Sequence, residues 1–152
     1  MAEKRYRIGD FAKLVGLSTY TLRYYEDQGL IVAQRDENGV RFYTEEDIRW
    51  VGFILHLKGT GMRLNELKRY VKLRAMGDTT ITERREMLQK VRDNAEADIA
   101  ELQMHLQVLG HKIDWYDGKV DHTIADSESF HDYLQRFNAS IVKSSATLRI
   151  YS

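Results

Sequence analysis

Residues 8–29 read IGDFAKLVGLSTYTLRYYEDQG, and this stretch decides the fold. Its first half places four apolar side chains on one helical face: Ile8, Phe11, Leu14 and Val15. Gly16 is typical of a residue that ends a helix. Ser18 is a favoured N-cap residue, so a second helix is expected over Thr19–Gln28, ended by Gly29. Two short helices joined by a turn have the spacing of a helix-turn-helix motif.

The next segments predict a hairpin and two further helices. Strand-like runs within residues 30–43 flank Asp36-Glu37-Asn38-Gly39, and Asn-Gly is the strongest short hairpin signal. Thr44 and Asp47 predict a capping box that begins a third helix, which glycines break at 59–61. A fourth helix is expected over residues 63–74. The apolar faces expected for these two helices hold Ile48, Val51 and Leu55, with Phe53 and Ile54 as further candidates, and then Leu64, Leu67, Tyr70 and Val71.

A long helix is predicted from residue 81 to about residue 116, after a boundary at Gly77-Asp78-Thr79-Thr80. Positions 81, 85, 88, 92, 95, 99, 102, 106, 109, 113 and 116 alternate steps of four and three, and nine of these eleven are apolar. This pattern predicts a coiled-coil seam, because the rest of the chain offers too little to cover so long a helix. The expected dimer contacts are Leu88, Ala95, Ile99, Leu102, Leu106, Leu109 and Ile113. Gly118 is expected to end the helix, and residues 127–137 to form a short one.

Composition excludes several classes of protein. Among 152 residues there is no cysteine, so disulfides, thiolate metal sites and cysteine nucleophiles are ruled out. Because we find neither a long apolar run nor a secretory leader, we expect a soluble cytoplasmic protein without membrane contact. Residues 1–75 carry 14 basic and 10 acidic side chains, and residues 76–152 carry 9 and 13. The excess of basic residues in the first half favours a polyanionic partner for that half. Random variation in surface charge would produce a difference of this size about as often as a polyanion-binding surface would.

The motif resembles the mercury-resistance-regulator (MerR) family of bacterial transcription factors. The matching residues are those at 8–18 and 21–26, then Gly29-Leu30, Arg35, Gly39, Arg41, Tyr43, Asp47-Ile48, Lys58, Gly61 and Met62. The resemblance implies a mostly α fold, with a winged helix-turn-helix over residues 1–76 and a dimerisation helix over 81–117 in an antiparallel coiled coil. Residues 118–152 match nothing in it, and their role is open, an effector-related one included.

The resemblance also implies a function. Such proteins are homodimers that bind a pseudopalindromic operator in a promoter spacer and distort the double-stranded DNA, so that RNA polymerase is affected indirectly. An architectural, excisionase-like DNA-bending protein without an inducer is the alternative. An enzyme is not expected, because we find no phosphate-binding glycine loop, metal pair or nucleophile elbow.

Candidate DNA contacts follow from the same positions. Thr19 and Tyr20 are expected near base edges, together with Ser18. Arg23 is expected to contact a phosphate, or a phosphate and a guanine edge, and Tyr24 offers a hydroxyl to a phosphate, with a packed aromatic as the alternative. Leu22 and Tyr25 are expected in the core. The remaining candidates are basic or phenolic residues of the hairpin and of the 59–61 break: Arg35, Arg41, Tyr43, Lys58 and Arg63. Arg41 and Tyr43 are two apart and should share a strand face, and solvated charge is the alternative for Arg35 and Arg63.

The signal is expected to be a small organic molecule, neither a metal nor a thiol reagent. His56 stands in the stretch where electrophile-responsive members of the family carry a cysteine. The spacing of the five histidines gives no helical ligand pair, and no metal or cofactor is expected. Aromatic side chains and His56 are candidates for a ligand pocket, with plain packing as the alternative: Trp50, Phe53, His56, Tyr70, Trp115 and Tyr116.

Overall fold

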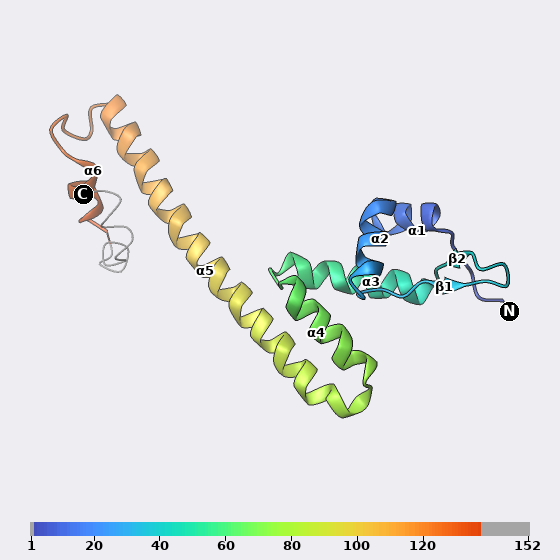
Figure 1. Cartoon of the computed structure of the whole chain (residues 1–152). Coiled ribbons are helices and arrows are strands. Elements are labelled where there is room, and N and C mark those ends of the chain that lie inside the picture. Colours follow the sequence, from blue (N-terminus) through green and yellow to red (C-terminus); the bar gives the residue numbers. More distant parts are fainter. Residues whose placement is uncertain (1, 138–152) are drawn as a thin grey trace. The chain divides into compact units, whose positions relative to one another are not determined.

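The computed structural model describes residues 2–137 (Figure 1). The chain divides into two compact units, Met1–Ala95 and Glu96–Ser152, so the longest helix begins in the first and ends in the second. The described residues are mostly helical, as expected from the sequence. None of the described helices is both long enough and apolar enough to span a membrane.

The first two helices are those that the sequence predicts. Helix α1 spans Ile8–Val15 and ends at Gly16, which has a φ of 71°. Helix α2 spans Thr19–Asp27, and the Ser18 hydroxyl oxygen accepts the N–H of Thr21 at 3.1 Å. The end of α1 depends on Gly16, because only glycine adopts the left-handed conformation at no cost. The beginning of α2 depends on Ser18, whose side chain satisfies an otherwise unpaired backbone N–H.

The hairpin after α2 consists of β1 (Gln34–Arg35) and β2 (Arg41–Phe42), paired antiparallel. The Asp36 carboxylate accepts the N–H groups of Asn38 and Val40, each at 2.9 Å, and so closes the turn. It also pairs with the Arg7 guanidinium at 2.7 Å. The hydrogen bond from Arg7 and those from the two backbone N–H groups hold the pKa of Asp36 below its usual value.

Helix α3 spans Glu45–Gly59 and helix α4 spans Leu64–Ala75. The predicted capping box is confirmed, since the Thr44 N–H donates to Asp47 Oδ2 at 2.8 Å. The expected faces are confirmed at four positions, Val51, Ile54, Leu67 and Tyr70, and the structure adds Leu57 and Leu73. The residues buried on α3 and α4 are Val51, Ile54, Leu57, Leu67, Tyr70 and Leu73, whereas Ile48, Leu55, Leu64 and Val71 are half-buried.

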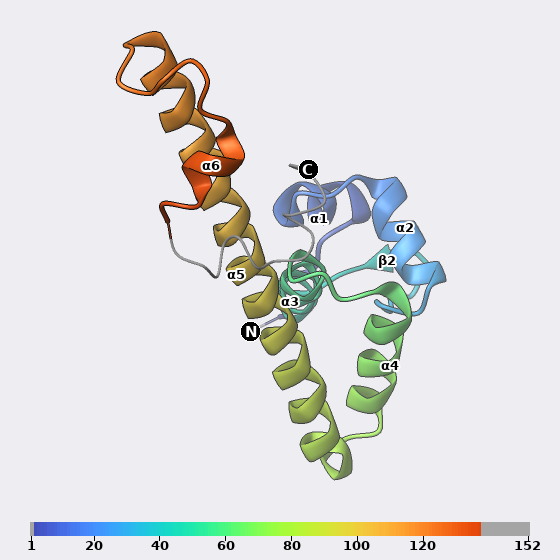
Figure 2. The same ribbon diagram turned by 90° about the vertical axis from the view of Figure 1, so that its left-hand side faces the viewer.

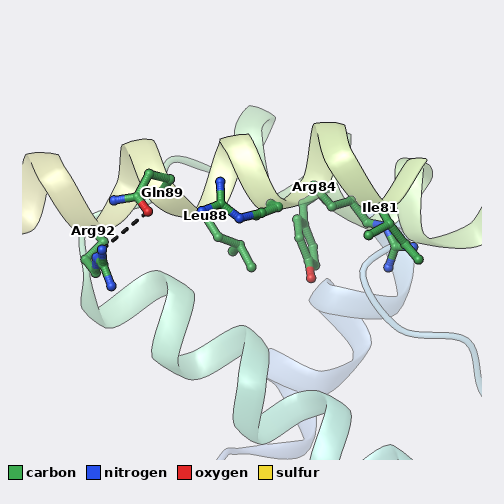
Figure 3. Close-up of a pocket in the computed structure, with 7 residues that line it drawn as sticks. Ile81, Arg84, Leu88, Gln89 and Arg92 are labelled. Atoms are coloured by element: carbon green, nitrogen blue, oxygen red, sulfur yellow. Dashed lines mark hydrogen bonds between the residues drawn. The ribbon is translucent and has the colours of Figure 1, made fainter. Parts of the chain in front are cut away.

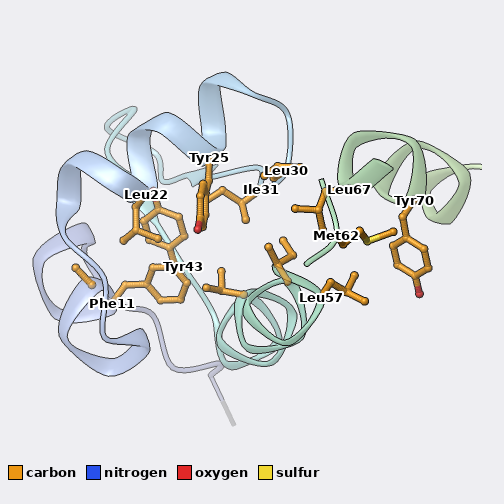
Figure 4. Close-up of a cluster of buried hydrophobic side chains, with 13 residues drawn as sticks. Phe11, Leu22, Tyr25, Leu30, Ile31, Tyr43, Leu57, Met62, Leu67 and Tyr70 are labelled. Carbon is orange, nitrogen blue, oxygen red and sulfur yellow. The ribbon is translucent and has the colours of Figure 1, made fainter. Parts of the chain in front are cut away.

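The core of the first unit lies between these helices and the hairpin. Its labelled members in Figure 4 come from the helices α1 to α4 and from the segments that connect them: Phe11, Leu22, Tyr25, Leu30, Ile31, Tyr43, Leu57, Met62, Leu67 and Tyr70. A short 3-10 helix, η1 (Asp78–Thr80), joins α4 to α5, and these two helices form a hairpin (Figure 2). From the beginning of α5, Met87, Leu88 and Val91 pack against the core. Leu88 is therefore partly covered within its own chain.

Helix α5 spans Ile81–Val120, 40 residues. Farther along it, the predicted seam is uncovered in the single chain. Six seam side chains are each 56% to 60% exposed: Ile99, Leu102, Leu106, Leu109, Ile113 and Tyr116. On another face of the helix, Val108 packs with Phe130 and Leu134 of α6 (Phe130–Leu134). Helix α6 is shorter than the segment 127–137 expected from the sequence.

The expectation that Gly118 ends α5 is wrong, because the helix continues to Val120. Gly118 is buried, and its carbonyl accepts the N–H of Ile124 at 3.0 Å. A Cβ at position 118 would lie 2.4 Å from Ile124 Cδ1. The glycine thus allows the returning chain to approach the helix closely, and it does not mark a helix stop.

We expect Gly118→Ala to lower the thermal unfolding midpoint, because the added methyl group displaces Ile124 at a cost of about 1–3 kcal/mol. Gly110→Ala is the matched control, since a Cβ at Gly110 meets nothing within 4 Å and alanine favours the helix. Differential scanning calorimetry compares the two variants. Equal or higher stability of Gly118→Ala would show that Ile124 does not pack on this glycine.

Candidate nucleic-acid interface

Helix α2 turns a polar aromatic and basic face outward. Tyr20 is 80% exposed, Tyr24 is 42% exposed, and Arg23 is also exposed. Leu22 and Tyr25 lie on the opposite face, and both are buried, as predicted. The helix therefore presents two hydroxyl groups and one guanidinium to solvent while its apolar side fixes it to the core. Donors of these kinds are suited to phosphate oxygens and base edges.

Ser18 and Thr19 stand at the beginning of this helix. The Ser18 hydroxyl is engaged as the N-cap and also lies 2.9 Å from Thr21 Oγ1, so it positions the helix. Thr19 is half-buried. Contact of either residue with a base edge stays a prediction.

The two hairpin arginines have partners within the chain. Arg41 Nε donates to Glu26 Oε1 at 3.2 Å, which ties β2 to α2. Arg35 Nη1 donates to the Gly39 carbonyl at 2.8 Å across the turn. These contacts hold two guanidiniums on the hairpin, and their contact with phosphate is untested.

The position of Tyr43 differs from the sequence-based expectation that its side chain faces outward to contact a DNA phosphate. Its ring is 1% exposed and stacks on Phe11, with ring centroids 4.3 Å apart. Its backbone N–H and carbonyl both pair with those of Tyr6 at 2.8 Å. Beyond β2, Tyr43 continues the extended chain as an antiparallel bridge to Tyr6, and its side chain turns toward Phe11 in the core. Because the phenol is buried, the expected phosphate contact by Tyr43 is wrong.

The hydroxyl of Tyr43 has no hydrogen-bond partner among the described residues. Burial raises the pKa of this phenol above its usual value, and the nearby Glu26 carboxylate adds to the effect. Both causes disfavour the phenolate, so Tyr43 acts as an uncharged core residue.

Lys58 and Arg63 flank the turn between α3 and α4, where Gly61 has a φ of 90°. Lys58 Nζ donates to the Tyr25 hydroxyl at 2.8 Å, which links this turn to α2. Arg63 is exposed, and its backbone N–H donates to Glu66 Oε2 at 3.1 Å. The turn thus holds two cations beside the beginning of α4, and their contact with DNA is untested.

The candidate ligand residues fall into separate groups. Trp50, Phe53 and Tyr70 form one aromatic cluster in the first unit, with centroid distances from 5.9 to 6.5 Å. Trp50 Nε1 also donates to the Leu30 carbonyl at 2.9 Å. His56 is exposed on α3. In the second unit Trp115 lies against Tyr116 and Phe130, with centroids 5.0 and 5.9 Å away.

Sequence reasoning missed the anchors of the hairpin. Arg7 donates to the carbonyls of Val40 and Arg41 and pairs with Asp36, and Glu26 receives Arg41. Arg7 lies outside the recognised motif, and although Glu26 lies within it, neither pairing could be read from the sequence, because both partners are distant in sequence. Among the described residues, no three His, Cys, Asp or Glu side chains are grouped so that they could hold a metal ion.

Known proteins share this arrangement. Residues 6–74 match the MerR HTH family regulatory protein domain, and residues 48–111 match the domain described as MerR, DNA binding. An uncharacterized HTH-type transcriptional regulator of Haemophilus influenzae is 38% identical over 112 residues, which cover 73% of this chain and 83% of that protein.

Two solved structures are similar as well. HiNmlR, a MerR family regulator lacking the sensor domain and bound to promoter DNA, is 36% identical with a TM-score of 0.70, over 77% of this chain and 94% of that one. A putative MerR family transcriptional regulator from Listeria monocytogenes is 32% identical with a TM-score of 0.72, over 89% and 98%.

We expect Tyr43→Phe to raise the free energy of unfolding by about 1 kcal/mol at neutral pH, because it removes a buried hydroxyl without a partner. In the parent protein the raised pKa of Tyr43 means that the unfolded state loses its proton first, so stability falls as the pH rises above about 10. The variant should lose part of this alkaline dependence.

Denaturant titrations between pH 7 and pH 11 measure both effects. Tyr20→Phe, at an exposed hydroxyl, is the control and should change neither. A stability loss in Tyr43→Phe would mean that the hydroxyl is hydrogen-bonded in the folded protein.

Proposed function

This chain belongs to the MerR family of helix-turn-helix regulators, and we propose that it acts as a homodimer on a pseudopalindromic operator within a promoter spacer. Its class is that of a DNA-binding transcriptional regulator and not of an enzyme. The observation that carries the proposal is the outward face of α2, where Tyr20, Arg23 and Tyr24 stand exposed over a buried Leu22 and Tyr25.

In the proposed complex, α2 lies in the major groove with its first turn toward base edges. Arg23 and Tyr24 contact phosphates or bases, and the hairpin reaches the flanking backbone through Arg35 and Arg41. Lys58 and Arg63 form a second backbone contact. Backbone contacts of this kind offset the cost of distorting DNA, which amounts to a few kcal/mol. The distortion realigns the promoter elements, so that RNA polymerase responds without a contact to this protein.

The exposed stripe of α5 supports the homodimer. Its six apolar side chains continue the seam pattern from Ile99 to Tyr116, and nothing in the described chain covers them. A second copy running antiparallel would bury this stripe and place the two α2 helices on opposite half-sites, as a two-fold operator requires.

A small organic effector completes the proposal. The cluster of Trp50, Phe53 and Tyr70 provides aromatic surface in the first unit, and Trp115 and Tyr116 of the second unit would approach it from the partner subunit. His56 lies one helical turn after Phe53 on α3 and offers a polar group to the effector. Without cysteine, the effector is held by noncovalent contacts.

We expect the protein to protect a two-fold site between promoter elements in the DNA that flanks its own gene, and to make the central bases reactive toward a single-strand-sensitive probe. Arg23→Ala should weaken protection at least about tenfold, because a charge-assisted contact is lost. Arg49→Ala, at an exposed position of α3, is the control. Protection without central reactivity would favour the architectural, excisionase-like alternative instead.

We expect Leu102→Lys with Leu106→Lys to yield monomers that bind the operator poorly, since lysines in a buried seam repel and remain unpaired. Ala100→Lys with Gln107→Lys is the matched control, because both positions are exposed and lie off the seam. Sedimentation velocity reports the mass. A dimer that survives the seam substitutions would place the interface elsewhere.

A further inference from the structure

A cavity of about 370 Å³ lies in the first unit, between α4 and the beginning of α5 (Figure 3). This volume is in the range of small-molecule sites. Tyr70 lines it from α4, and Ile81 and Leu88 add apolar surface from α5. Its other lining residues are polar, and three of them are arginines: Arg84, Arg85 and Arg92.

The charged residues that line this cavity are all arginines, and Arg92 among them already has partners within the chain. No acidic residue is among the described residues that line it. Arg84 is held in place, because its Nε donates to Thr80 Oγ1 at 3.1 Å and its Nη2 to the Gly77 carbonyl at 3.2 Å. Arg85 forms no hydrogen bond or ion pair with the described residues. The nearby Glu83 does not neutralise the site, since it pairs with Arg69 at 2.6 Å outside the lining.

The proposed dimer would bury the positive charge of these arginines, which is unfavourable without a counter-charge. Ile81, Arg85 and Leu88 continue the heptad register of the seam. Leu88 already packs within its own chain, but Ile81 and Arg85 are exposed, and a partner helix on them would cover the mouth of the cavity. The exposed part of the seam, from Ile99 to Tyr116, contains no carboxylate at a seam position. A guanidinium taken out of water without a counter-charge destabilises an interface. An anion in the cavity would remove that cost.

We propose that this cavity binds a small organic anion whose carboxylate is held by Arg84 and Arg85 and whose apolar body rests on Tyr70 and Leu88. Arginine matches a carboxylate in a planar, two-pronged contact. The inference rests on the proposed function for the effector and the dimer, and it names the chemical class of the effector. It also moves the expected site from the whole aromatic cluster to the side of Tyr70 that faces α5.

Trp50 provides a reporter for binding, because its ring stacks near Tyr70 with centroids 6.5 Å apart. The chain has two tryptophans, so Trp115→Phe leaves Trp50 as the single emitter. Sodium benzoate and sodium hexanoate are titrated as probes, with acetate and inorganic phosphate for comparison. We expect a saturable change of Trp50 emission with benzoate or hexanoate, and weaker responses to the two small anions.

Arg85→Gln should weaken the response at least about tenfold, the loss expected for one charged hydrogen-bonding group. Lys90→Gln is the matched control, because it removes the same charge from an exposed position of the same helix outside the cavity. Sedimentation of the parent protein should show a tighter dimer with the bound carboxylate, by linkage.

Three results would overturn the inference. These are no saturable change with benzoate or hexanoate, equal responses of Arg85→Gln and the parent, or phosphate binding as tightly as benzoate. Operator protection is measured on the same samples. Protection without carboxylate binding removes this inference and leaves the proposed function, whereas saturable carboxylate binding without any operator protection supports the cavity and removes the operator proposal.

Discussion

The stack of Tyr43 on Phe11 is the contact on which the DNA-binding unit depends. It joins the end of the hairpin to α1, and the backbone of Tyr43 joins the same point to Tyr6. Arg41 then ties the hairpin to α2 through Glu26. Helix and hairpin are therefore held to one core, so the side chains on α2 and those on the hairpin keep a fixed spacing. A DNA-binding protein needs such a fixed spacing, because the phosphates of the DNA backbone lie at regular distances.

The features that the sequence predicted are those determined within a few residues. The glycine end of α1, the serine cap of α2 and the capping box at Thr44 each depend on near neighbours, so residue type alone indicates them. Tyr43 and Gly118 were misassigned for the opposite reason. The burial of Tyr43 depends on Phe11, far away in sequence, and the close packing at Gly118 depends on the return of the chain to Ile124.

The seam of α5 shows a similar division. The heptad pattern is visible in the sequence. It does not indicate which seam side chains pack against other parts of the same chain and which remain exposed. Leu88 lies against the core of the first unit, whereas Leu102 and Leu106 remain more than half exposed. Only the later positions are thus available in full to another chain. Among the described residues, few elements accompany this 40-residue helix, and its exposed later stretch is the part that the proposed dimer would bury.

Tyr70 is the residue through which the cavity and the DNA-binding face can influence each other. It lines the cavity and packs on Trp50 and Phe53, and Trp50 donates to the carbonyl of Leu30, shortly after α2 ends at Asp27. Leaving a partly buried hydrogen bond of this kind unmade costs about 1–3 kcal/mol, so the packing of Trp50 is coupled to the position of the chain after α2. A ligand that binds one packing of Tyr70 better than another therefore shifts the equilibrium between two positions of α2. The free energy of this shift cannot exceed the difference in binding free energy between the two packings.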